Sequence, residues 1–253
     1  MLSETAKNVF ARLGLRFPAV AVKLHYSQPD NVDRINKSLS FCQFVREAQD
    51  SGRKFFITKD DDNCFGKMVL GMIDKPALGA SGQAGYDFGV FKTPAANARL
   101  YNMLPTLVRG AHNFVVFCPV AACDFDPDLV IVVADTAQAD IVMRATSYIS
   151  GDLWESKTSS VLSCAWTYAY PYVSGKVNVC VTGLHHGMKR RNVYPAGMHI
   201  IAIPYQKLLE VVTALTEMDW ELLAMKEDGE SKALLAAKMA KWQEMSPDFV
   251  LKK

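Results

Sequence analysis

Two stretches of the sequence repeat one pattern of cysteine and glycine residues. The first, CQFVREAQDSGRKFFITKDDDNCFG, runs from Cys42 to Gly66, and the second, CAWTYAYPYVSGKVNVCVTG, runs from Cys164 to Gly183. Each opens with a cysteine, reaches a Ser-Gly pair followed within two residues by lysine, and crosses a short apolar segment to a second cysteine. The opening cysteine precedes the Ser-Gly glycine by 10 residues in the first stretch and by 11 in the second. This spacing predicts a duplicated unit of helix start, glycine cap, short strand and second cysteine.

Two copies of such a unit, related by an internal pseudo-twofold axis, could bring four thiolates to a shared interface. Four thiolates suit a [4Fe–4S] cluster or an all-cysteine zinc site. The spacing does not decide between them, because the C-x2-C-x2-C run of ferredoxins and the two-cysteine knuckles of zinc ribbons are both absent. Redox switching by a subset of the cysteines, or simple burial, are the alternatives. We interpret Cys118, within FVVFCPV, as a core residue. The predicted metal ligands are Cys42, Cys64, Cys164 and Cys180.

A basic turn, LHHGMKRRN, follows the last of these cysteines at residues 184–192. A histidine or methionine here, or His199 further on, could be an axial haem ligand or replace a thiolate on iron. Arginine at this turn, with Lys189 beside it, could hold a carboxylate or phosphate. The alternative is a solvated basic turn. Covalent c-type haem attachment is not indicated, because no C-x2-C-H motif is present. The predicted cofactor-binding residues are His185, His186, Met188 and Arg190.

Three further stretches have less specific compositions. GASGQAGYDFGVF (79–91) holds four glycines and predicts a loop that could let a phosphate or flat cofactor approach the backbone. It lacks both the dinucleotide-binding and the P-loop glycine patterns. KDDDN (59–63) predicts a solvated loop rather than a hard-cation site. The alternating aromatics of 166–172 have strand spacing, but Pro171 and the parallel with the first unit favour a helix that packs in the core and at a dimer contact.

The elements that must position these residues alternate along the chain without a long linker. Helical spacing and capping residues predict helices at 2–13, 38–52, 93–107, 136–151, 206–225 and 231–244. Strands are predicted at 18–26, 54–58, 113–120, 128–135 and 197–205, with 113–120 and 128–135 as antiparallel neighbours because their link is short. We expect one α/β (α+β) domain over 1–253, with a core at about 17–205, a mixed β-sheet flanked by helices, an internal pseudo-repeat and a helical C-terminal extension (206–253).

Composition excludes several classes of protein. The chain has 253 residues, 50% hydrophobic and 21% charged, which is typical of a globular protein. A net charge of +2 gives no support for nucleic-acid binding. No secretory signal or apolar run of membrane-spanning length is evident, so we expect no membrane span and a cytoplasmic location. Six cysteines in a reducing compartment are expected to be free, metal-bound or catalytic rather than paired as disulfides.

Several motifs, in order, resemble the prokaryotic family known as domain of unknown function 169 (DUF169). They are FPAVAVKL, FCQFVREAQ, NCFGKMVLGM, PDLVIVVADTAQADIVMRATSYISG and the second cysteine stretch, and together they cover about residues 17–205. The resemblance implies that the four cysteines recur in the family, which strengthens the prediction of a shared centre. The chain departs from the family's usual pattern after Cys180, where two histidines, a methionine and a basic run stand in place of a glycine-rich turn. The resemblance implies no reaction.

These observations together predict an iron–sulfur redox protein. A [4Fe–4S] cluster would serve electron transfer or a cofactor-linked redox role, with haem or another group as a second cofactor at the basic turn. A redox partner protein and a homodimer are expected. One alternative is a module that binds a small anion or cofactor, with structural or zinc-binding cysteines. Another is an enzyme whose substrate binds an open iron. Whether the chain is an enzyme stays open at this point.

Overall fold

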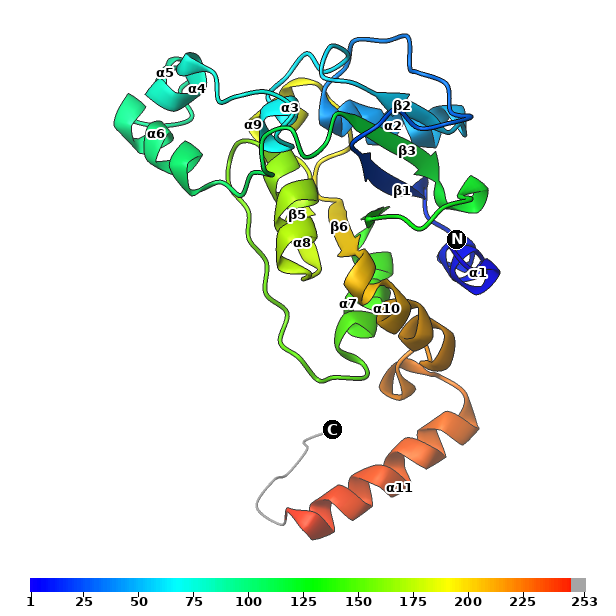
Figure 1. Ribbon diagram of the computed structural model, residues 1–253. Helices are drawn as coiled ribbons and strands as arrows, with labels where there is room; N and C mark the ends of the chain where they lie inside the picture. The colour runs from blue at the N-terminus through cyan, green and yellow to red at the C-terminus, as the bar shows by residue number, and fades with distance from the viewer. Residues whose placement is uncertain (247–253) are drawn as a thin grey trace. The chain divides into compact units, whose positions relative to one another are not determined.

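The structure is a computed structural model that describes residues 1–246, and the chain divides into two compact units, Met1–Thr216 and Glu217–Lys253. The strands that the structure describes all lie in the first unit and form one six-stranded sheet in the order β2-β3-β1-β4-β6-β5 (Figure 1). Every neighbouring pair of these strands is antiparallel. Parallel pairing is confined to two isolated bridges, Arg34 with Phe56 and Leu39 with Asp62. The predicted α+β class is confirmed, but the sheet is antiparallel instead of the expected mixed sheet.

The boundaries follow the sequence patterns closely. The first unit contains α1 (Glu4–Arg12), β1 (Phe17–His25), α2 (Phe41–Ser51), β2 (Phe55–Ile57), α3 (Gly66–Val69), α4 (Ala77–Ser81), α5 (Gln83–Asp87), α6 (Pro94–Met103), β3 (Phe114–Pro119), η1 (Val120–Ala122), β4 (Leu129–Ala134), α7 (Thr136–Ser147), η2 (Ala165–Ala169), α8 (Tyr170–Ser174), β5 (Asn178–Val181), α9 (His186–Arg190), β6 (His199–Pro204) and most of α10 (Tyr205–Glu217). The second unit contains η3 (Leu223–Met225) and α11 (Gly229–Met245). The helix predicted at 231–244 is α11, whereas the helix predicted at 206–225 is α10 and already ends at Glu217.

The predicted internal repeat is visible in the order of the strands. The first half of the sheet is built by β1, α2, β2 and β3, and the second half by β4, η2 with α8, β5 and β6. In each half the chain passes from a central strand through a helix to an edge strand and then to the strand between them. The two central strands, β1 and β4, pair with each other. A twofold exchange of the halves therefore maps β2 onto β5 and β3 onto β6.

The prediction that residues 113–120 and 128–135 are antiparallel neighbours is wrong. Strand β1 lies between β3 and β4 and pairs antiparallel with both, so β3 and β4 run in the same direction. The short link that contains η1 crosses the end of β1, and η1 packs against α1 and β1. A short connection limits how far apart two strand ends lie, but it does not prevent an earlier strand from inserting between them.

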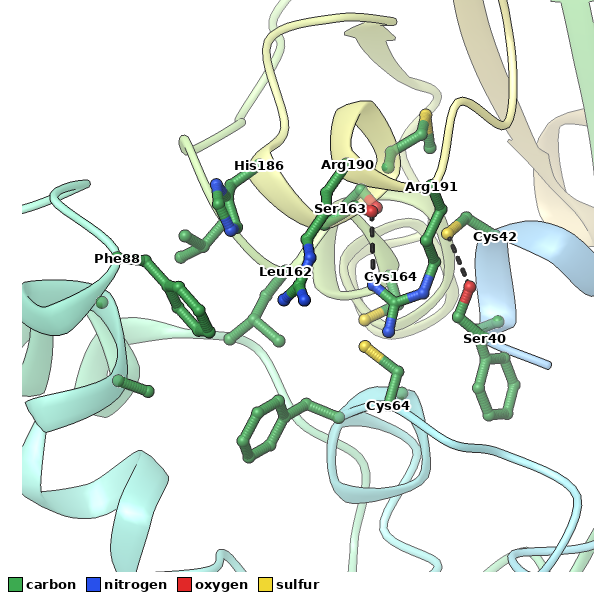
Figure 2. Close-up of a pocket in the computed structure, with 18 of the residues that line it drawn as sticks. Ser40, Cys42, Cys64, Phe88, Leu162, Ser163, Cys164, His186, Arg190 and Arg191 are labelled. Atoms are coloured by element: carbon green, nitrogen blue, oxygen red, sulfur yellow. Dashed lines mark hydrogen bonds between the residues drawn. The ribbon is translucent and has the colours of Figure 1, made fainter. Parts of the chain in front are cut away.

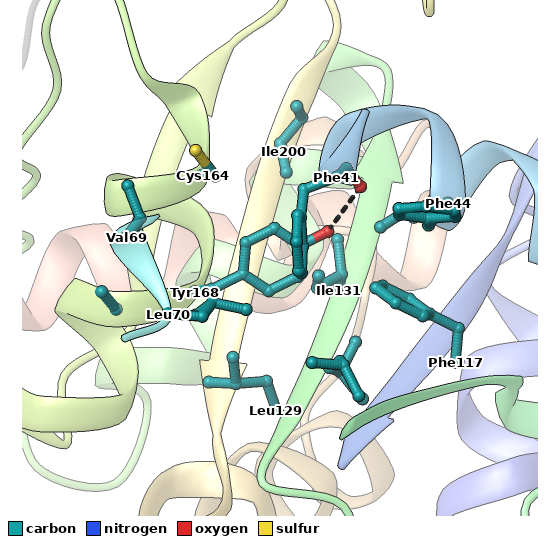
Figure 3. Packing of buried hydrophobic residues seen from close by; sticks show 14 of the residues in the cluster. Phe41, Phe44, Val69, Leu70, Phe117, Leu129, Ile131, Cys164, Tyr168 and Ile200 are labelled. Carbon is teal, nitrogen blue, oxygen red and sulfur yellow. Dashed lines mark hydrogen bonds between the residues drawn. The ribbon is translucent and has the colours of Figure 1, made fainter. Parts of the chain in front are cut away.

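The helices of the repeat cover one face of the sheet and form the main core (Figure 3). Phe41 and Phe44 of α2 pack on Phe117 of β3, with ring centroids 6.3 and 5.7 Å away. Tyr168 of η2 meets the Phe41 ring edge-on at 5.6 Å. Its hydroxyl donates a hydrogen bond of 3.0 Å to the Phe41 carbonyl oxygen, across 127 residues of sequence. On the opposite face, α7 packs against β4 and β6.

The glycine-rich segment 79–91 is not the predicted loop, because most of it forms α4 and α5. These two short helices pack against α6 and against each other, to one side of the sheet (Figure 1). We call residues 77–103, which contain the three helices, the cap. Gly82 separates α4 from α5 with φ +75°, and a Cβ there would lie 2.0 Å from the Pro94 carbonyl oxygen. The glycines therefore serve the close packing of helices rather than an open loop.

Within residues 1–246, no helix is long and apolar enough to cross a membrane. The predicted location in the cytoplasm stays a prediction.

Candidate functional site

One cavity of about 230 Å³ lies between the start of α2, α3, the cap, the helix that begins at Ser163 and α9. Three of the four predicted metal ligands, Cys42, Cys64 and Cys164, line it. Figure 2 shows their thiols coming from three separate elements toward the same space. We call this space the cysteine cavity. The fold therefore brings together three cysteines from separate segments of the chain.

Cys42 is positioned by the cap of α2. It is the second residue of the helix, after the N-cap Ser40, and the side chain of Gln43 accepts a hydrogen bond of 3.1 Å from the Ser40 backbone N–H. The Ser40 hydroxyl and the Cys42 thiol are 3.2 Å apart. Serine followed three residues later by glutamine is the sequence signature of this capping box. The helix start, and with it the direction of the Cys42 side chain, is therefore encoded locally.

Cys64 is positioned by a buried carboxylate. Asp62 is 1% exposed, and its side chain accepts hydrogen bonds from the backbone N–H groups of Cys64 (3.1 Å) and Lys67 (2.8 Å). Burial, as the largest effect, raises the pKa of this carboxyl, and the two backbone hydrogen bonds oppose the rise. Gly66 allows the turn to approach α2, because a Cβ there would lie 2.1 Å from the Phe41 ring.

The expectation that residues 59–63 form a solvated loop is therefore wrong for its last two aspartates. Asp61 is 7% exposed and Asp62 is 1% exposed. Asp61 pairs with the Arg34 guanidinium at 2.9 Å and accepts the Thr58 backbone N–H at 2.8 Å. Composition alone predicted solvation, but hydrogen bonds to local backbone groups and one arginine compensate the burial of both carboxylates.

Cys164 lies at the start of a helix that contains a π-helical insertion. Residues 163–174 form one continuous helix whose segment Ala165–Ala169 is π-helical, and Cys164 is its second residue. The helix has 12 residues, against 11 in α2. A π-bulge accommodates one extra residue in a helix and is frequent at functional sites. The extra residue explains why the Cys-to-Gly spacing differs by one between the two sequence units, while both cysteines keep equivalent positions.

Cys180 lies outside the cysteine cavity. It sits within β5, 1% exposed in the apolar core, and its sulfur is 3.7 Å from the Asn178 side-chain nitrogen. The strands explain this placement. β2 and β5 both begin three residues after their glycine, so Cys180, third in β5, corresponds to Ile57 in β2 and not to Cys64. The first unit reaches its second cysteine only after the loop that follows β2.

Burial shapes the chemistry of the three cavity thiols. Burial raises the pKa of Cys42, and the hydrogen bond with Ser40 opposes the rise. Burial also raises the pKa of Cys64, and the positive charge of Arg191 opposes this rise. The pKa of Cys164 lies well above the ordinary value, through burial and then through the negative charges of Cys64, Asp62 and Cys42. All three pKa values are thus shifted in the direction that disfavours the thiolate, which is the nucleophilic form of cysteine.

The basic turn contributes three of its four predicted cofactor-binding residues to the same cavity. Met188, His186 and Arg190 line it from α9, together with Arg191. Figure 2 shows the Arg191 side chain reaching toward Cys64 and Cys164. Its Nη1 donates a hydrogen bond of 3.3 Å to the Gly187 carbonyl oxygen, which holds the guanidinium against its own helix.

His185 is separated from this group. It is fully buried, is not part of the cavity lining, and its Nε2 lies 2.8 Å from the Thr158 hydroxyl. Burial lowers the pKa of His185 to about 4. His185 is therefore a neutral, hydrogen-bonded side chain that supports the start of α9.

The cap contributes residues that the sequence did not single out. The Phe88 ring packs against the His186 ring in a tilted arrangement, with centroids 5.2 Å apart and an interplanar angle of 31°, and the Arg190 guanidinium lies 5.5 Å from the Phe88 centroid. Asn97 of α6 is fully buried and also lines the cavity. No motif marks these two residues. Only the glycine-rich composition of 79–91 indicated that this segment contacts something.

Among residues 1–246, no three histidine, cysteine, aspartate or glutamate side chains form a group that could hold a single metal ion. Tetrahedral coordination of one zinc ion requires sulfur ligands about 2.3 Å from the metal. The three thiols share a cavity but do not form such a compact set.

Comparison with known proteins identifies the family but no activity. The profile of DUF169, described as uncharacterised ArCR, matches residues 11–214. The chain is 24% identical over 220 residues to the uncharacterized protein MJ0308 of Methanocaldococcus jannaschii, an alignment that covers 85% of this chain and 93% of that protein. No solved structure matches the chain significantly. The family match covers the whole sheet and all the segments that line the cysteine cavity, so the chain belongs to the DUF169 family.

Proposed function

We propose that this protein is an iron–sulfur redox protein in which Cys42, Cys64 and Cys164 hold a [4Fe–4S] cluster in the cysteine cavity. The observation that carries the proposal is that three cysteines from segments far apart in sequence line one cavity. Soft thiolate ligands favour iron–sulfur clusters, zinc and Cu(I) over hard cations. The proposal keeps three of the four cysteines expected from the sequence and omits Cys180, which lies in the core of β5.

A cluster and a single ion make different demands on the spacing of the thiols. Each cysteine of a [4Fe–4S] cluster binds a different iron, so its ligands stand farther apart than those around one metal ion. No group of side chains among the described residues is compact enough for one ion. Three cysteine ligands leave the fourth iron without a protein thiolate. This iron can take an exogenous ligand. The protein could therefore serve in electron transfer, or it could be an enzyme whose substrate binds the open iron, and the two roles must be distinguished by experiment.

The charges around the cavity suit a redox centre. A cluster with thiolate ligands carries net negative charge, and the guanidiniums of Arg190 and Arg191 lie on the same cavity. Nearby positive charge stabilises the more negative, reduced state and raises the reduction potential. An electron-transfer role also requires a redox partner protein. The homodimer stays a prediction, and sedimentation measurements test it.

We do not extend the proposal to haem. His185 is committed to a hydrogen bond with Thr158 outside the cavity lining. Met188 and His186 do line the cavity, but its volume of about 230 Å³ is below the range of about 300–1,000 Å³ that holds drug-sized ligands. A haem together with a cluster would not fit in this space.

The test is anaerobic purification and reconstitution with iron and sulfide, followed by metal analysis, a UV–visible spectrum and electron paramagnetic resonance. We expect about four iron atoms per wild-type chain. Cys42→Ser, Cys64→Ser and Cys164→Ser should each lose most of this iron. Cys180→Ser is the matched control, because it removes a buried thiol outside the cavity, and it should retain the cluster.

Two results would overturn the proposal. A colourless wild-type protein that binds no iron after reconstitution would exclude the cluster, and stoichiometric zinc without iron would favour structural cysteines. If Cys180→Ser loses iron as fully as Cys64→Ser while remaining folded, the three-cysteine ligand set is incorrect. Circular dichroism of every variant separates loss of the cluster from loss of the fold.

A further inference from the structure

Two polar side-chain atoms at the cysteine cavity have no partner among residues 1–246. Asn97 is fully buried, and its Nδ2 donates a hydrogen bond of 2.8 Å to the Gly82 carbonyl oxygen, which fixes the orientation of the amide. Its Oδ1 has no hydrogen-bond partner within residues 1–246, and neither does the buried Nε2 of His186. Buried polar atoms in native proteins nearly always have partners. Oδ1 can only accept, so the missing partner is a donor.

Two positive charges on the cavity also lack an anionic partner. Neither Arg190 nor Arg191 forms an ion pair with any described residue, and Arg191 makes hydrogen bonds with the Gly187 carbonyl oxygen and the Cys64 thiol. Guanidinium groups bind carboxylates and phosphates through paired hydrogen bonds. The site therefore offers positive charge at α9 and a hydrogen-bond acceptor at α6.

The walls between these polar groups are apolar and partly flat. Phe65, Phe88 and Leu162 line the cavity, and the Phe88 ring lies against both the His186 ring and the Arg190 guanidinium. An inorganic anion would leave this apolar surface without contacts. A ligand with a flat apolar body would cover it, and the volume of about 230 Å³ limits that body to about one ring.

From these three features we infer that the cysteine cavity binds a small, flat organic carboxylate that carries an O–H or N–H donor. The carboxylate pairs with Arg190 and Arg191, the apolar body lies against Phe88 and Leu162, and the donor reaches Asn97 Oδ1. The inference goes beyond the proposed function and does not rest on it, because the volume of about 230 Å³ that limits the ligand to about one ring is that of the cavity without a cluster. The arginines and the amide do not require the cluster.

The experiment measures binding of simple probes by calorimetry, with both the apoprotein and the reconstituted protein. The probes are benzoate, 3-hydroxybenzoate, 4-hydroxybenzoate, benzamide and inorganic phosphate. We expect a hydroxybenzoate to bind more tightly than benzoate, and benzamide and phosphate to bind at least about tenfold more weakly, because one loses the charge and the other the apolar body. Arg190→Gln should weaken hydroxybenzoate binding about tenfold. Lys189→Gln is the matched control, since Lys189 is an exposed cation of α9 outside the cavity lining, and it should leave binding unchanged.

The results of this experiment test the ligand site and the proposed cluster separately. Hydroxybenzoate binding to a protein that loads no iron supports the ligand site and overturns the cluster. A protein that loads iron on reconstitution but binds no carboxylate probe as the apoprotein overturns the ligand site and keeps the cluster. Phosphate binding as tight as hydroxybenzoate binding, or equal losses in Lys189→Gln and Arg190→Gln, would also overturn the inference, because the recognition would then be unspecific charge attraction.

Discussion

Cys42 and Cys164 occupy the same position in the two halves of the sheet. Each is the second residue of a helix that ends at a glycine in the left-handed conformation, Gly52 (φ 65°) in one half and Gly175 (φ 66°) in the other. Each glycine precedes an edge strand by three residues. The two thiols thus reach one cavity from symmetric elements, and Cys64 joins them from the turn before α3.

The π-helical insertion should absorb the extra residue without moving Cys164. Deleting Thr167 removes one residue from the π segment and leaves a helix of 11 residues, the length of α2, with Cys164 still its second residue. We expect the deletion variant to retain iron in reconstitution, with a lowered melting temperature because the buried residues of the π segment must repack. Thr167→Ala, which keeps the length, is the control and should also retain iron. Loss of iron in a folded deletion variant, with iron retained in Thr167→Ala, would show that the insertion itself positions the thiol.

The glycines of the cap should contribute to stability in a graded manner. Gly82 and Gly89 both have positive φ, but a Cβ at Gly82 would lie 2.0 Å from the Pro94 carbonyl oxygen, whereas nothing lies within 4 Å of a Cβ at Gly89. Gly89→Ala should cost about 1–2 kcal/mol of unfolding free energy from the backbone conformation alone. Gly82→Ala should cost about 1–3 kcal/mol more because of the clash. Urea unfolding of both variants measures the difference, and equal losses would contradict the packing of α4 and α5 on α6.

The hydrogen bond between Tyr168 and Phe41 should stabilise the junction of the two halves. The Tyr168 hydroxyl is buried and donates to the Phe41 carbonyl oxygen at 3.0 Å. Tyr168→Phe removes the donor and should lower the free energy of unfolding by about 1–2 kcal/mol. Tyr148→Phe is the control, because Tyr148 is 54% exposed, and it should change stability little. Loss of equal size in both variants would exclude the buried bond as the cause.

His185 should make the protein sensitive to mild acid. Burial lowers its pKa from 6.5 to about 4, so the folded protein binds fewer protons than the unfolded chain between these values. The resulting stability is present in full above pH 6.5 and is lost as the pH falls toward 4, by up to about 3 kcal/mol. His185→Gln should flatten this part of the stability profile in urea unfolding at several pH values. His186→Gln is the neighbouring control, and an unchanged slope in His185→Gln would contradict the assignment.

Much of the local structure could be predicted from the sequence, because capping and turn chemistry act over a few residues. Ser3 and Thr93 accept hydrogen bonds from the first turns of α1 and α6, and Gly52 ends α2 as the pattern indicated. The duplicated spacing predicted the repeat because the same helix, glycine and strand recur at nearly the same intervals.

The tertiary structure decided which segments of the chain lie close to one another. The insertion of β1 between β3 and β4 depends on partners remote in the sequence. The burial of Asp62 and the packing of the cap helices depend on how each segment folds back on its neighbours in space. The placement of Cys180 has the same origin. Its spacing resembled that of Cys64, but position within a strand fixes the direction of a side chain, and β5 directs this thiol into the core. The sequence by itself determined that cysteines recur in a duplicated unit, and the sheet decided which of them share a cavity.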